Sequence, residues 1–170
     1  MDINESNDER PPLVEEVIHV EIEIIERVET LTLPDSDDVV LMEQIREKLE
    51  LPPEIHFFER GKEAAFTHHA KGRKHIRLVG HHCQSVNLVV QYDHLDKVHH
   101  FPPATTVSAA VQWAAGKQAY NLDPIAAAKA NLILPGADQP LPKEDVLGKY
   151  VKAGQCELVV SLTLKDFTNG

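Results

Sequence analysis

The sequence predicts an α+β protein that contains two tandem copies of one unit, each a mixed sheet packed on one helix. Three observations predict this fold class. Apolar and polar residues alternate in several short stretches, as in half-buried strands. A segment with helical apolar spacing follows the first predicted hairpin of each half, and the order of elements restarts 68 positions along the chain.

The first unit begins with a strand from Val17, since its apolar residues recur at every second position up to Ile24. A partner strand ends at Pro34, which has no amide hydrogen to donate. Side-chain oxygens at 35–38 then favour a helix N-terminus, and apolar residues at helical spacing run to Leu49. Further strands are predicted at 55–58 and 75–79, with a turn at 60–62 between them.

The second unit repeats this order with one insertion. Ile18, Val20 and Ile22 are matched 68 positions later by Val86, Leu88 and Val90. A helix is predicted to start at 105–108, and residues 120–129 hold about eight extra positions before a strand at 132–134. A final strand is predicted from strict alternation, with Cys156, Leu158, Val160, Leu162 and Leu164 sharing one face.

In both units the last strand is expected to lie beside the first. Two strands that are distant in sequence and have no hairpin between them pair most simply in parallel. The helix then covers the apolar face of the sheet. The predicted organisation is an acidic arm without regular structure at 1–13, domain 1 at 14–80, a linker at 81–85, domain 2 at 86–164 and a flexible tail at 165–170.

Composition narrows the function classes. The formal net charge of −10 argues against nucleic acid or an anionic membrane surface as a partner. No stretch reaches the ~20 apolar residues that span a bilayer. The two cysteines, Cys83 and Cys156, form no CxxC pair, so we expect free thiols and a cytoplasmic location.

The segment LILPGADQPLPKEDVLGKYVKAGQCELVVSL, within residues 131–162, resembles the second half of ubiquitin. The shared features are a Leu-Ile strand, a Gly turn, an anchoring Leu, an Asp before Leu-Gly-x-Tyr, and a final alternating strand. The resemblance covers roughly Val86 to Gly170 and implies the β-grasp fold there. The first unit resembles the ubiquitin family in its element order alone.

Two such units resemble the tandem ubiquitin-like modifiers, among them the interferon-induced vertebrate protein and the proteins of bacterial antiphage conjugation operons. The resemblance implies a protein that is not an enzyme and needs no cofactor of its own, since the activating enzyme uses the ATP. It implies attachment of Gly170 to target proteins through adenylate and thioester intermediates. The implied partners are an E1-like activating enzyme, an E2-like conjugating enzyme, a deconjugating or processing protease, and target proteins.

The physical character of the tail agrees with that role. A carboxylate must be activated before an amine attacks it, and glycine lets the chain end enter a narrow cleft because it has no Cβ. Six residues extend about 20 Å, enough to reach a buried active site. The tail departs from the family at Asp166 and Phe167, and has one terminal glycine, Gly170, where ubiquitin has two; Thr168 and Asn169 complete it.

Family members are bound through an exposed apolar patch on the sheet. The matching positions here are Leu95 in the first turn of unit two, Ile133 on its third strand and Val159 on its last. The alternative function is an adaptor that docks partners through these surfaces without conjugation.

A small thiol or metal enzyme is the third alternative. Histidine doublets lie at 68–69, 81–82 and 99–100, and Cys83 follows one of them. Neighbouring strand residues point to opposite faces, and no HxxxH or CxxC spacing is present, so no metal site is predicted. Cys156 is expected in the core, because it shares parity with Leu158. Trp113 is expected to pack on the apolar face of its helix.

Overall fold

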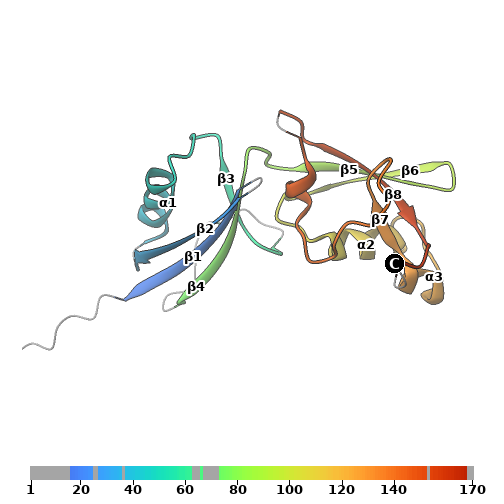
Figure 1. Cartoon of the computed structure of the whole chain (residues 1–170), viewed down its shortest axis with the longest axis horizontal. Coiled ribbons are helices and arrows are strands. Elements are labelled where there is room, and N and C mark those ends of the chain that lie inside the picture. The colour runs from blue at the N-terminus through green and yellow to red at the C-terminus, as the bar shows by residue number, and fades with distance from the viewer. Residues whose placement is uncertain are drawn as a thin grey trace, which may run out of the picture.

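The computed structural model has two four-stranded sheets, each with its own core and helices, joined end to end (Figure 1). Both domains are therefore α+β, and they are tandem β-grasp domains. The acidic arm predicted at 1–13 lies outside the described residues. The structure describes residues 16–24, 27–35, 37–62, 66, 73–152 and 154–167.

The first domain has the strand order β2-β1-β4-β3. The predicted alternation is confirmed on β1, where Ile18, Val20 and Ile22 are fully buried. The Asp37 carboxylate accepts a hydrogen bond from the amide of Val40 at 3.0 Å, which satisfies one free amide at the start of the helix. The elements are β1 Val17–Ile24, β2 Arg27–Pro34, α1 Asp38–Lys48, β3 His56–Glu59 and β4 His75–His81.

The second domain repeats this arrangement in the order β6-β5-β8-β7. Leu141 and Leu147 anchor the long segment between β7 and β8 in the core. Trp113 is partly buried against that core, as predicted, and its ring contacts His99 and Phe101. The elements are β5 Val86–Tyr92, β6 Leu95–Phe101, α2 Val107–Ala115, α3 Pro124–Lys129, β7 Asn131–Ile133, the 3-10 helix η1 Leu147–Tyr150 and β8 Glu157–Thr163.

The insertion predicted at 120–129 contains a short helix that the sequence pattern did not reveal. Asp123 accepts hydrogen bonds from the amides of Ile125 and Ala126, both at 3.0 Å, and Pro124 occupies the first turn. The Tyr120 hydroxyl donates to the carbonyl of Val90 at 2.7 Å. The insertion is thus bonded to the sheet rather than being a free loop. Among the described residues, no helix is long and apolar enough to cross a membrane.

The parallel pairing of first and last strands is confirmed in both domains. β1 pairs with β4 in the register Val20 with Ile76, and β5 pairs with β8 in the register Leu88 with Leu158. The hairpin partner of each first strand is antiparallel and forms one edge of its sheet. Each final strand therefore lies between two other strands of its sheet. The segment that follows it starts from a position held by hydrogen bonds on both sides.

The two domains are packed against each other at the junction between β4 and β5. Phe58 and Val79 of domain 1 form a small buried cluster with Ala104 and Val146 of domain 2. The amide of Gly61 donates to the carbonyl of Ala104 at 2.9 Å. The Arg60 guanidinium also donates to the carbonyl of Glu144. These contacts join the two domains directly.

The expectation of free thiols is wrong for this structure, because Cys83 and Cys156 form a disulfide. Cys83 lies between β4 and β5, and Cys156 directly precedes β8. Parallel pairing brings the starts of β5 and β8 side by side, with Asn87 opposite Glu157. Two cysteines that are 73 positions apart in sequence therefore meet at one end of the sheet.

The predicted burial of Cys156 is also wrong. Cys156 is exposed, whereas Cys83 is buried. The alternation that predicted a core position applies only within β8, which begins at Glu157. Outside the strand, the backbone no longer alternates faces, so parity with Leu158 carries no information.

Reducing the disulfide should lower the stability of the second domain. A cross-link that closes a loop of this length restricts the unfolded chain and contributes about 4 kcal/mol in the loop-entropy description. We expect dithiothreitol in metal-free buffer to lower the urea midpoint of the wild type to that of a Cys83→Ser, Cys156→Ser variant. The variant itself should not respond to the reductant. An unchanged wild-type midpoint would contradict the structural role of the bond.

Candidate functional site

The start of the tail lies against its own domain. The amide of Lys165 donates to the Thr163 hydroxyl at 3.2 Å, and the Lys165 ammonium lies 5.4 Å from the centre of the Phe167 ring. Phe167 is partly buried and lines a cavity of about 450 Å³ between α3, β7 and the tail. Asp166 lines the same cavity. Thr168, Asn169 and Gly170 lie outside the described residues.

This cavity, which we call the tail cleft, carries a local positive charge on an acidic protein. Lys129, Lys143 and Lys165 line it from three different segments, and all three are exposed. Among the described residues that line it, Asp166 is the one carboxylate. Lys129 also ends α3, where a cation is favoured by the free carbonyls of the helix. The tail therefore leaves the domain through a basic surface.

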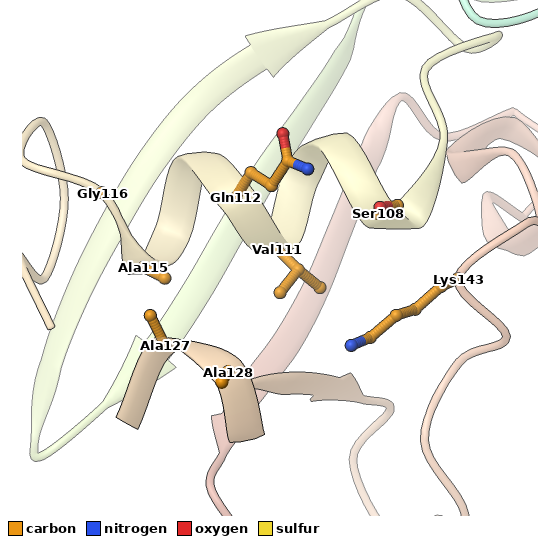
Figure 2. A pocket seen from close by; sticks show the side chains of 8 residues that line it. All are labelled: Ser108, Val111, Gln112, Ala115, Gly116, Ala127, Ala128 and Lys143. Carbon is orange, nitrogen blue, oxygen red and sulfur yellow. The ribbon is translucent and has the colours of Figure 1, made fainter. Parts of the chain in front are cut away.

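A second cavity, of about 350 Å³, adjoins the tail cleft and shares Ala128 and Lys143 with it. Figure 2 shows α2 and α3 facing each other across this space, with the Lys143 side chain reaching toward it from the following loop. Val111, Ala115 and Ala127 supply its apolar lining. Small side chains on both helices leave this groove open.

The exposed face of the second sheet carries a row of valines. Val98 lies opposite Val89 across the β5–β6 ladder, and Val89 lies opposite Val159 across the β5–β8 ladder. Val98 is 52% exposed. Ile133 is on the same face, since its register partner on β8 is Ser161, two positions from Val159. The structure thus brings Ile133 and Val159 onto one face on neighbouring strands, with Val89 and then Val98 on the other side of Val159.

Leu95 lies apart from this row. It pairs with Tyr92 at the end of the β5–β6 hairpin, and Tyr92 packs against the core. Residues paired directly across an antiparallel ladder project to the same face, so Leu95 belongs to the helix side of the sheet. It remains 59% exposed because it sits at the hairpin tip. Sequence reasoning missed Val89 and Val98, although the alternation of β5 already assigns Val89 to the face opposite Leu88.

A cluster of His81, His82 and Cys83 lies at the domain junction. Their potential ligand atoms are all within 4.8 Å of one another. The objection that neighbouring strand residues point to opposite faces does not apply, since β4 ends at His81. Burial lowers the pKa of His81 below its usual value, so the neutral imidazole is favoured; the hydrogen bond to Gly148 opposes this effect, and the nearby His82 adds to it.

Replacing Phe167 by Ala should release the start of the tail. The lost ring contact with Lys165 and with the tail cleft leaves residues 165–167 without their apolar anchor. We expect the backbone ¹⁵N heteronuclear NOE of these residues to fall in the variant, while Phe167→Leu retains most of the order. Equal values in the wild type and the Ala variant would show that Phe167 does not anchor the tail.

Comparison with known proteins agrees with the fold. Residues 87–165 match the family described as BilA ubiquitin-like domain 2. The match begins at the second residue of β5 and ends at the first residue of the tail. No curated protein matches the chain. The second domain is therefore similar to the BilA ubiquitin-like domain 2 family, and the fold of the chain is two tandem β-grasp domains.

Proposed function

We propose that the chain is a ubiquitin-like modifier, joined through the carboxylate of Gly170 to lysine amines of target proteins. The observation that carries this proposal is the direct passage from β8 of a ubiquitin-like domain into a short tail that ends in glycine. A ubiquitin-like domain of this kind belongs to a modifier or an adaptor. The tail favours the modifier.

In the proposed reaction, the Gly170 carboxylate attacks the α-phosphate of ATP on an E1-like enzyme and releases pyrophosphate. A cysteine thiolate of that enzyme then displaces AMP and forms a thioester. Transfer to an E2-like cysteine follows, and a target lysine amine displaces the thiolate to give an isopeptide bond. A deconjugating protease hydrolyses that bond with water and frees the carboxylate again. This chain supplies the carboxylate and the surfaces that the enzymes bind.

Activation requires part of the tail to leave its cleft. From Phe167, only three residues remain to Gly170, an extended reach of about 10 Å. Freeing the tail back to Lys165 adds roughly 7 Å to that reach. Binding of the activating enzyme therefore competes with the contact of Phe167 against the tail cleft. The catalytic groups and the ATP belong to the enzyme, and we propose no enzymatic activity and no cofactor for this chain.

The requirement for ATP and for reduced enzyme cysteines assigns this reaction to the cytoplasm. The BilA type of the second domain supports partners encoded in the same bacterial operon and a role in antiphage defence. The net charge of −10 supports protein partners over nucleic acid or a membrane surface.

The second candidate function is a docking adaptor that is not conjugated. The valine row on the second sheet favours it, since Val98, Val89 and Val159 form a continuous apolar strip across three strands. The two functions are compatible in one molecule, because the strip and the tail occupy different surfaces. A modifier also needs a surface that its enzymes and readers bind.

Deleting Gly170 should abolish activation. The activating enzyme holds the terminal carboxylate in line with the ATP phosphate, and a displaced carboxylate loses about a hundredfold or more in rate. The measurement is thioester formation with the cognate E1-like and E2-like enzymes and ATP, with Thr168→Ser as the matched control. A wild type that forms no thioester, or a deletion variant as active as the wild type, would refute conjugation through Gly170.

A glutamate on the face of the sheet that carries the valine row should weaken enzyme binding. We expect Val98→Glu or Ile133→Glu to raise the KM for conjugation roughly tenfold or more, with little change in kcat, because a charge disrupts an apolar contact. Leu95→Glu is the matched control, since Leu95 lies on the other side of the sheet. The row has no such role if Leu95→Glu has the larger effect.

A further inference from the structure

Four side chains with nitrogen or sulfur ligand atoms gather where the two domains join. His81, His82 and Cys83 bring their ligand atoms within 4.8 Å of one another, and Cys156 is bonded to Cys83. Two sulfurs and two imidazoles are the ligand set of a structural zinc site. Three of the four are consecutive in sequence, which explains why motif spacing did not reveal the cluster.

The hydrogen bond of His81 favours metal binding through Nδ1, whereas the His82 ring, which stacks on the His81 ring with centroids 4.5 Å apart, must turn to bind the same ion. The Nε2 atom of His81 lies 3.0 Å from the carbonyl oxygen of Gly148, and the Nε2 atom of His82 lies 3.3 Å from that of Gln155. A carbonyl oxygen only accepts, so each Nε2 carries the hydrogen and each Nδ1 keeps a lone pair. Metal-bound histidines commonly donate their other N–H to a backbone carbonyl in this way.

The Nδ1 lone pair of His81 already has a modest partner, the amide of Cys83 at 3.0 Å. A metal ion would replace that hydrogen bond. Cys83 and His81 are buried, so an ion there must be neutralised by its ligands. Two thiolates balance the two charges of Zn²⁺, and two neutral imidazoles add none. The Cys83 sulfur lies 3.1 Å from the carbonyl oxygen of Gln155, which is the same oxygen that the His82 ring contacts.

We propose that, when the disulfide is reduced, Cys83, Cys156, His81 and His82 bind one zinc ion at the domain junction. A dithiol reductant converts the disulfide to two thiols and is itself oxidised to a disulfide. The sulfurs then separate to roughly 3.8 Å, the spacing of two thiolates on a tetrahedral zinc. Both thiols release their protons as the two Zn–S bonds form.

This site would perform the same structural task as the disulfide under reducing conditions. Both join the segment that links the domains to the start of β8. A disulfide does not persist in a reducing cytoplasm, whereas zinc held by thiolates does. The inference does not depend on conjugation through Gly170, since it concerns the isolated protein.

The test uses the full chain, reduced with tris(2-carboxyethyl)phosphine, stripped of metal and titrated with Zn²⁺ or with Co²⁺ as a spectroscopic probe. We expect about one zinc per chain, thiolate-to-cobalt charge-transfer bands, and a rise of at least about 5 °C in the thermal midpoint with zinc. The oxidised protein and the Cys83→Ser, Cys156→Ser variant should show none of these effects.

His82→Asn tests the imidazole contribution, because His82 is only partly buried and its replacement spares the core. Zinc affinity should fall at least roughly tenfold. His100→Asn, on the exposed side of β6, is the matched control and should leave affinity unchanged. The proposal is overturned if the reduced wild type binds no zinc, if the double serine variant binds it equally well, or if the two histidine variants have the same affinity.

Discussion

The parallel ladder between the first and last strands of each domain is the constraint on which the rest of the structure depends. In domain 2 the pairing of β5 with β8 places Val89 beside Val159 and the start of one strand beside the start of the other. The pairing of Val89 with Val159 builds the valine row. The alignment of the two strand starts brings Cys83 to Cys156. At the opposite end of the same ladder, β8 leads into the tail cleft, so one hydrogen-bonded strand positions the valine row, the disulfide and the tail.

The junction between the domains depends on a close approach at Gly148. A Cβ at Gly148 would lie 2.9 Å from the His81 ring and from the Pro103 side chain, so only glycine fits there. This close approach lets the Gly148 carbonyl accept the His81 hydrogen bond. Buried apolar contacts and the cross-link to Cys156 reinforce it. Under the proposed function, enzymes that bind the tail meet a surface to which both domains contribute.

Most of the fold was predictable because it rests on local patterns. The alternation on β1 and β5 reflects burial of every second side chain. The acidic residue before α1 reflects capping of the helix by Asp37.

The disulfide, the valine row and the position of Phe167 were missed because they depend on contacts between segments that are distant in sequence. The disulfide follows from the register of Asn87 with Glu157, and the valine row requires Val98 to be matched with Val89. The helix α3 was missed because its six residues are too short to show a clear apolar period. The position of Phe167 in the tail cleft likewise depends on α3 and β7 being brought together.

Conjugation in cells offers the most direct test of the modifier role, because trypsin would leave an identifiable remnant of this chain on a modified target. Trypsin cleaves after Lys165, so a modified target should yield a peptide whose lysine carries the five residues from Asp166 to Gly170. The predicted result from cells that contain the proposed activating and conjugating enzymes is a set of such branched peptides, absent when Gly170 is deleted. Recovery of these five residues only as a linear peptide, with no branched form, would contradict the proposal that Gly170 is joined to other proteins.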